Sequence, residues 1–186
     1  MIFYPVFIVT SFALIGVVNG FLLQDFSVSF AHAGLALLIV VVVDIVVAAA
    51  TRLFPEEKID PFQAIFLPSA RERKVLLAIG VRTWKDIIPE TGKYLCHFAK
   101  DKIEKPEDNG YLLKFLRETI YAEAMHVISF FLGFSALLLP VYRWNIALPI
   151  ALVNAFLQFL PVCAQRYNRP RLIALYQYNQ RKGTQK

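Results

Sequence analysis

The sequence has few cysteines, and this scarcity argues against two classes of protein. Its 186 residues contain only Cys96 and Cys163. Two isolated thiols at that spacing are typical neither of a disulfide framework nor of a zinc site. Cys163 stands at the end of an apolar run, where a thiol packs as a small apolar side chain. We therefore expect no metal site and no cysteine crosslink in the fold.

Positive charge is absent from the first quarter of the chain, since no Lys or Arg precedes Arg52. A secretory signal peptide carries such residues before its apolar core, so this absence favours a transmembrane helix at the start of the chain. Hydrophobic residues make up 57% of the sequence, compared with roughly 45–50% in soluble domains. The length and composition predict a single membrane domain over residues 1–186.

Four apolar runs are long enough to cross the ~30 Å hydrocarbon layer of a bilayer. They cover about residues 2–23, 30–54, 121–139 and 145–163. The second run is rich in valine, but a lone β-strand leaves its backbone unsatisfied in lipid, so helix is the better prediction. We expect His32 to lie near the outer interface. The fold class is therefore an all-α integral membrane protein with four transmembrane helices.

The segment 55–117 has a different character, because prolines and basic residues interrupt its apolar stretches. The pattern over 91–103 predicts an amphipathic helix. Asp108 or Asn109 is placed to cap the next helix, which begins near Tyr111 and continues into the third span. We expect a partly amphipathic central segment on the cytoplasmic side.

The loops carry an asymmetric distribution of Lys and Arg. Residues 52–117 hold thirteen and the basic tail 165–186 holds six, so nineteen of the twenty lie on one side of a four-span topology. The positive-inside rule places this side, and with it both termini, in the cytoplasm. The net charge of +6 does not indicate a nucleic-acid partner, because the basic residues flank membrane spans and form no stacking platform.

Glu118, Glu123 and His126 form the first candidate group for chemistry. Residues three apart on a helix are neighbours, so Glu123 and His126 can share a face. A carboxylate that orients an imidazole is the pairing that a general base needs. The alternative is structural, with both glutamates on the helix surface in the headgroup region and His126 as a hydrogen-bonded core residue.

Asp44 is the second candidate, because a carboxylate near the bilayer centre costs about 2.5–3.5 kcal/mol and needs a partner inside the bundle. Asn154 in the fourth span and His126 in the third are the possible partners. A catalytic role and a neutral acid hydrogen-bonded to Asn154 that joins two helices both fit the sequence.

An amide stripe follows one face of the fourth helix, because Asn154, Gln158 and Gln165 recur at spacings of four and seven residues. Hydrogen bonding between helices explains such a stripe. Binding of a ligand hydroxyl is the functional alternative.

The string 165–171 ends the last apolar run with three arginines in six residues. Guanidinium groups bind phosphate in a bidentate manner. The alternative is that these residues only set the topology or snorkel to the interface. We predict a phosphate or headgroup site made of Gln165, Arg166, Tyr167, Asn168, Arg169 and Arg171.

Three motifs, in this order, resemble the bacterial glycosyl-4,4′-diaponeurosporenoate acyltransferase family. They are Val81-Arg82-x-Trp84-Lys85 with a nearby Gly92, then Glu118-Thr119-x-x-Ala122-Glu123-x-x-His126, and finally Gln165-Arg166-Tyr167-Asn168-Arg169-Pro170-Arg171-Leu172. The resemblance covers about half of the chain. It implies a small enzyme of the bacterial cytoplasmic membrane that transfers an acyl chain to a hydroxyl of a glycosylated or lipid acceptor, as in carotenoid biosynthesis.

The hypothesis that follows is a membrane O-acyltransferase with its active site near the cytoplasmic interface. His126, oriented by Glu123, would deprotonate the acceptor hydroxyl. The three arginines would bind the phosphates of an acyl donor such as acyl-CoA, while Trp84 and Lys85 would close the site. An apolar channel between the spans would hold the acyl chain. No bound cofactor is expected, and the sequence indicates no oligomeric state.

Two other functions compete with this hypothesis. A small membrane methyltransferase of the isoprenylcysteine or phospholipid type has a similar layout, but the chain lacks paired glutamates after its last span. A non-enzymatic lipid-binding or assembly subunit would use the same polar groups for helix packing and headgroup contacts. The His-x4-Asp motif of other glycerolipid acyltransferases is absent, because Phe131 follows His126 at that position and Lys102 follows His97.

Overall fold

The computed structural model describes residues 3–88, 103–140 and 142–184. Helices form all the regular structure in these ranges, and four of them are long and apolar enough to span a membrane. The protein is thus an all-α membrane protein with four transmembrane helices, as the sequence predicts. The α-helices are α1 (Phe3–Leu23), α2 (Phe26–Thr51), α3 (Ala70–Ala78), α4 (Val81–Trp84), α6 (Asn109–Leu132) and α7 (Leu148–Thr184), joined by short helices η1 (Glu56–Lys58), η2 (Ala64–Phe66), η3 (Lys85–Ile87), η4 (Gly133–Leu138) and η5 (Arg143–Ala147).

The chain divides into two compact units. One, here called the apolar unit, consists of Ile2–Leu53 and Met125–Leu160. The other, the polar unit, contains Phe54–Ala124 and Pro161–Lys186. Helices α6 and α7 contribute residues to both, so each unit is described by itself.

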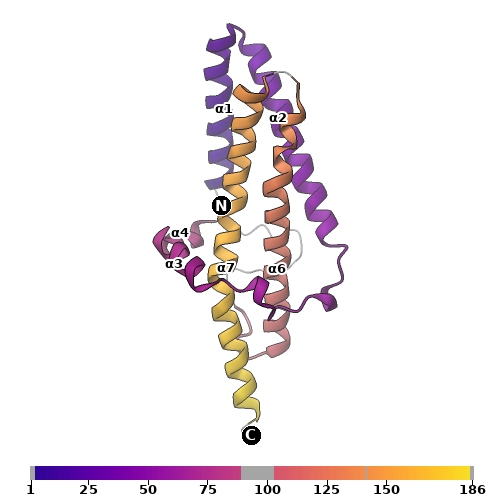
Figure 1. The fold of residues 1–186 in the computed structure, drawn as a ribbon, viewed down its shortest axis with the longest axis vertical. Coiled ribbons are helices and arrows are strands. Elements are labelled where there is room, and N and C mark those ends of the chain that lie inside the picture. The colour runs from indigo at the N-terminus through magenta and orange to yellow at the C-terminus, as the bar shows by residue number, and fades with distance from the viewer. Residues whose placement is uncertain (1–2, 89–102, 141, 185–186) are drawn as a thin grey trace. The chain divides into compact units, whose positions relative to one another are not determined.

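The apolar unit begins with the hairpin of α1 and α2, which lie side by side (Figure 1). Asp25 caps α2, since its Oδ1 accepts a hydrogen bond from the backbone N–H of Val28 at 3.0 Å. The hydroxyl of Ser29 donates to the carbonyl of Gly16 at 2.8 Å. A Cβ atom at Gly16 would lie only 2.4 Å from the ring of Phe30. Glycine is therefore required here for the two helices to approach closely.

The core of the apolar unit is built from small and branched side chains. Ala36 and Val40 of α2 pack with Ala136 of η4, Ala147 of η5 and Ile150 of α7. On the outer faces of α1 and α2, large apolar side chains such as Val9, Leu22 and Ile45 are more than half exposed. Such a surface suits contact with lipid chains.

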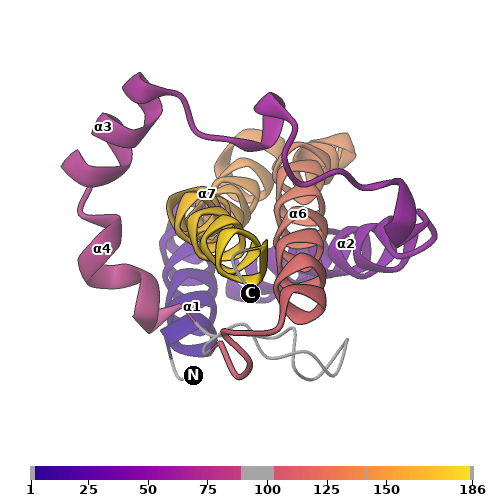
Figure 2. The same cartoon turned by 90° about the horizontal axis from the view of Figure 1, so that it is seen from below.

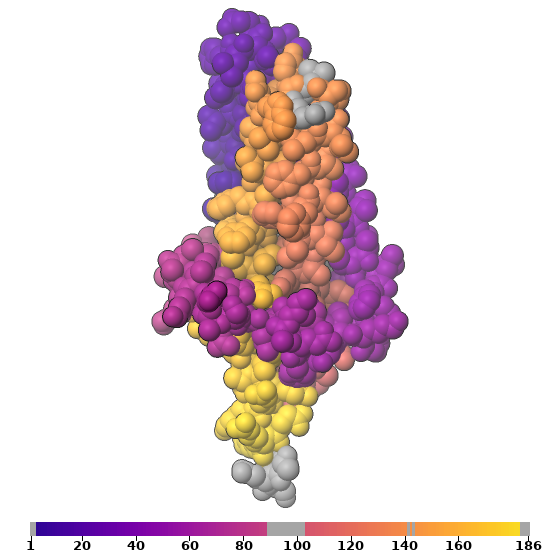
Figure 3. All heavy atoms as spheres, viewed as in Figure 1, coloured from indigo at the N-terminus to yellow at the C-terminus, as the bar shows by residue number. Residues whose placement is uncertain are grey.

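The polar unit is organised by a belt, residues 54–84, that passes around its parts of α6 and α7 (Figure 2). In the space-filling view the side chains of the belt cover one side of these two helices (Figure 3). Two contacts fix its start to α6: the Tyr121 hydroxyl donates to the carbonyl of Phe54 at 2.5 Å, and Nε of Arg117 donates to that of Ile59 at 3.2 Å. The belt continues into α3 and α4, and Glu72 of α3 binds Arg166 of α7.

Two helix boundaries bear on the predictions. Asp108 caps α6, because its Oδ1 accepts from the backbone N–H of Tyr111 at 3.1 Å, which confirms one of the two predicted caps. Helix α7 does not end near residue 163 but continues through Pro161 and Pro170 to Thr184. The residues predicted to form a basic tail are therefore mostly helical. The amphipathic helix predicted over 91–103 lies, except for Ile103, outside the described residues.

Candidate functional site

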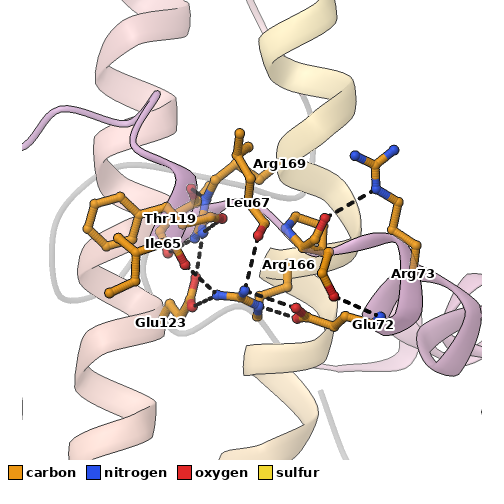
Figure 4. A network of polar contacts seen from close by, with 11 residues as sticks. Ile65, Leu67, Glu72, Arg73, Thr119, Glu123, Arg166 and Arg169 are labelled. Atoms are coloured by element: carbon orange, nitrogen blue, oxygen red, sulfur yellow. Dashed lines mark hydrogen bonds and ion pairs between the residues drawn. The ribbon is translucent and has the colours of Figure 1, made fainter.

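Arg166 of α7 lies at the centre of an ion-pair network in the polar unit (Figure 4). Its Nε and Nη2 bind the two carboxylate oxygens of Glu72, the Nη2 contact being 3.0 Å. Its Nη1 lies 2.6 Å from Oε1 of Glu123. The carbonyls of Ile65 and Leu67 also accept from this guanidinium, at 3.3 and 3.4 Å. One side chain thus connects α7 with α3, α6 and the belt.

Arg169, one turn further along α7, is completely buried. Its Nη1 lies 2.5 Å from Oε2 of Glu123 and donates to the carbonyl of Phe66 at 2.7 Å. Its Nε and Nη2 donate to the hydroxyl and the carbonyl of Thr119, at 3.0 and 3.1 Å. The N–H groups of Arg169 are therefore directed at protein acceptors. This arrangement satisfies a buried cation, which is otherwise costly to remove from water.

Local sequence explains why these groups converge. Arg166 and Arg169 are three residues apart, so they share one face of α7. Ser69-Ala70-Arg71-Glu72 matches the sequence pattern of a capping box, and the Ser69 hydroxyl accepts from the backbone N–H of Glu72 at 3.2 Å. The cap places Glu72 in the first turn of α3. Sequence reasoning assigned no role to Glu72 or to Thr119, although the capping box could have drawn attention to Glu72.

The predicted residues Arg171, Tyr167, Trp84 and Lys85 also belong to the polar unit. The guanidinium of Arg171 is exposed, donates to the Tyr167 hydroxyl at 2.6 Å and lies 4.3 Å from the centre of the same ring. Trp84 and Tyr167 pack against a small core that includes Cys163. Nε1 of Trp84 donates to the carbonyl of Ile79 at 2.8 Å, and Nζ of Lys85 lies 2.5 Å from Asp86. An exposed cation and two aromatic rings thus lie on α4 and α7.

Three further predicted residues lie in the polar unit. Glu118 is buried at 4% exposure, whereas Gln165 and Asn168 on α7 are partly exposed. Among the described residues, no cluster of His, Cys, Asp and Glu side chains could hold a metal ion.

The apolar unit contains a second polar group, centred on Gln158 of α7. Nε2 of Gln158 donates to Oδ2 of Asp44 at 2.7 Å and to Oδ1 of Asn154 at 3.2 Å. Its Oε1 lies 2.6 Å from Nδ1 of His126. The two partners predicted for Asp44 therefore belong to one network with it. Asn154 also interacts with Asp44 directly, and Gln158 connects Asp44 with His126. The predicted pairing of Glu123 with His126 stays a prediction.

Asn154 extends this network and is itself 7% exposed. Its Nδ2 donates to the backbone carbonyl of Ser129 at 3.4 Å. Gly133 lies against the same amide, and a Cβ atom there would be 2.4 Å from Nδ2 of Asn154. The absence of a side chain at Gly133 therefore leaves room for Asn154 to hydrogen-bond within the unit.

An apolar crevice of about 70 Å³ lies in the apolar unit beside this network. Asp44 and Asn154 form part of its wall. The rest is mostly aliphatic and aromatic, contributed by α1, α2 and α7, and includes Ile8, Phe12, Leu37, Val41, Ile150 and Leu157. The lining is suitable for a hydrocarbon chain.

The family model described as glycosyl-4,4′-diaponeurosporenoate acyltransferase matches residues 61–178. This is more than half of the chain. The protein belongs to this acyltransferase family. The match confirms the resemblance drawn from the three motifs, all of which lie inside it. It also includes Asn154 and Gln158, whereas Asp44 lies outside it. The searches of curated proteins and of solved structures give no match.

Family membership gives a coarse assignment of function. The family's name describes an acyltransferase that acts in carotenoid biosynthesis, and the four apolar helices place such an activity in a membrane. A membrane acyltransferase is therefore consistent with both the four apolar helices and the three polar motifs of the sequence.

Proposed function

We propose that this protein is a membrane O-acyltransferase that moves a fatty acyl chain from an acyl donor to a hydroxyl of a glycosylated or lipid acceptor. The observation that carries the proposal is the family match over residues 61–178, which contains the Glu118-to-His126 motif and the arginine-rich string of α7. These motifs supply a base and cations, which are the groups that acyl transfer from an anionic donor needs.

His126 acts as the general base. It takes the proton of the acceptor hydroxyl, and the oxygen attacks the carbonyl carbon of the donor's thioester or ester. The tetrahedral intermediate then collapses, so that the carbon–sulfur or carbon–oxygen bond of the donor breaks. The leaving thiolate or alkoxide takes the proton from His126, which restores the neutral ring.

The arginines of α7 divide into two roles. Arg171 is exposed and the side chain of Arg166 is 19% exposed, so both can meet phosphate oxygens of a donor such as acyl-CoA. Arg169 is fully buried and holds Glu123, which in turn positions Arg166. Tyr167 and Trp84 pack against the same small core, and Lys85 follows Trp84 directly in the chain. Gln165 and Asn168 supply amide groups for the donor or the acceptor.

The topology supports a site that faces the cytoplasm. The excess of Lys and Arg in residues 52–117 and 165–186 supports an orientation in which both termini and the central segment face the cytoplasm of a bacterial cell. An acyl donor with phosphate groups is soluble in that compartment. The crevice beside Asp44 and Asn154 receives part of the acyl chain.

Lipid mass spectrometry of cells with and without the protein tests this proposal. We expect a lipid or glycolipid that appears only with the protein and is heavier than its precursor by one acyl chain. A product heavier by a methyl group would instead identify a methyltransferase. Identical lipid profiles in the two cultures would favour a non-enzymatic membrane subunit.

A further inference from the structure

The polar network of the apolar unit has a fixed hydrogen-bond direction. It begins at the backbone carbonyl of Ser129, which can only accept. Nδ2 of Asn154 must therefore face this carbonyl, and the Oδ1 of the same amide must face Gln158. Because Asn154 and Ser129 are both buried, water does not compete for the contact between them.

The orientation of Asn154 decides the orientation of Gln158. Oδ1 of Asn154 and Oδ2 of Asp44 are both acceptors, at 3.2 and 2.7 Å from the same atom of Gln158. That atom must be the amide nitrogen Nε2. A reversed amide would place the Gln158 oxygen against Oδ1 of Asn154, and against Oδ2 of Asp44 when that carboxyl is ionised, which costs at least one hydrogen bond in a partly buried setting.

Gln158 in turn determines which ring nitrogen of His126 carries the hydrogen. Its Oε1 lies 2.6 Å from Nδ1 of the ring and can only accept. Nδ1 must therefore carry the hydrogen, and a neutral imidazole has its lone pair on the other nitrogen. A carboxylate that orients a catalytic histidine directly does the same in a serine hydrolase. Here an amide lies between the carboxylate and the ring.

We propose that Gln158, held by Asp44 and Asn154, is a positioning residue that fixes His126 as the Nδ1–H tautomer, so that Nε2 is the basic nitrogen. The consequence for catalysis rests on the proposed function, in which Nε2 accepts the proton of the acceptor hydroxyl. The tautomer itself does not depend on the reaction. Asp44 therefore acts through Gln158 and does not contact the substrate in this role.

Nitrogen NMR of the full-length protein in detergent micelles, labelled with ¹⁵N-histidine, tests the inference. The chain has three histidines, so the His126 signals are assigned by their loss in a His126→Gln variant. At a pH where the ring is neutral, we expect a protonated Nδ1 and an imine-type Nε2. The opposite pattern in the wild-type protein would overturn the inference, whatever the variants show.

Variants show whether the Gln158 amide orients His126 or whether its side chain only fills space. Gln158→Met keeps the length of the side chain but removes the amide, and should give a mixture of tautomers. Gln177→Met, at an exposed site on α7, is the matched control and should leave the His126 signals unchanged. Asp44→Asn retains an oxygen that accepts from Gln158 and should preserve the tautomer, whereas Asp44→Leu should lose it. An unchanged tautomer in Gln158→Met would contradict the inference.

Kinetics distinguish this inference from the proposed function. Gln158→Met should lower kcat by about 10- to 100-fold, below the roughly 10²–10⁴-fold effect of losing a general base, with the donor KM unchanged. An increase in KM alone would contradict a positioning role. If the Nδ1–H tautomer is observed but His126→Ala retains full activity, the proposed function fails and the assignment of the tautomer stands.

Discussion

The guanidinium of Arg169 and the carboxylate of Glu123 form an ion pair of 2.5 Å between α7 and α6, and Arg169 has no exposed surface. Glu123 also binds Arg166, at 2.6 Å. One carboxylate therefore accepts two arginines three residues apart. This relationship makes Arg169 a stabilising residue, and in the proposed function Arg166 and Arg171 bind the donor phosphates.

Replacement of Arg169 by Met should destabilise the polar unit. Loss of one partner from a buried ion pair costs about 3–5 kcal/mol, because the remaining charge stays buried without compensation. Thermal unfolding in detergent measures the effect. Arg171→Met, at an exposed arginine two residues away, is the control and should leave the melting temperature nearly unchanged. Equal melting temperatures for the two variants would contradict the structural role of Arg169.

Replacement of Arg166 by Gln should weaken binding of the donor. Loss of a charge-assisted hydrogen bond worth about 1.5–3 kcal/mol corresponds to at least a tenfold rise in the KM for acyl-CoA. Steady-state kinetics at several salt concentrations measure this, since a phosphate contact weakens as salt increases. Arg71→Gln, on an exposed part of α3, should leave KM unchanged. An Arg166→Gln enzyme with the wild-type KM and salt dependence would remove Arg166 from the donor site.

Replacement of Gly133 by Ala should disturb the amide network of the apolar unit. The new Cβ would lie 2.4 Å from Nδ2 of Asn154, so Asn154 must move, and overpacking of this kind costs about 1–3 kcal/mol. The variant should unfold at a lower temperature in detergent. Gly34→Ala is the matched control, because no heavy atom lies within 4 Å of a Cβ there. If Gly133→Ala unfolds at the same temperature as Gly34→Ala, Asn154 can move without a loss of stability, and the prediction is wrong.

The sequence allowed the fold class to be predicted, because run length and the absence of charge decide what crosses a bilayer. The helix cap at Asp108 could also be predicted, because a capping residue is recognised from its immediate neighbours in the sequence. The length of α7 could not be predicted, because two prolines and a basic stretch indicate the end of a helix. In the structure the helix continues, and Leu172 and Ile173 pack against Phe115 and Leu116.

The candidate site was predicted in part. Spacing identified Arg166, Arg169, His126 and Gln158 as residues of interest, but it could not tell which of them pair. The assignment of Glu72 to Arg166 depends on how the belt brings α3 to α7, and that is a long-range contact without a local signal. Likewise, Asp44 was expected to meet Asn154 or His126, and only the packing of α2 on α7 shows that Gln158 bonds to Asp44, Asn154 and His126.

The most direct test of the central claim uses purified protein, an acyl-CoA and a glycosylated lipid with a free sugar hydroxyl. Mass spectrometry follows the acceptor over time with the wild-type protein and with His126→Ala, while circular dichroism checks that both are folded. The account predicts an ester product with the wild-type protein and a rate lower by about 10²–10⁴-fold with the variant. Equal rates of product formation by the two folded proteins would contradict it.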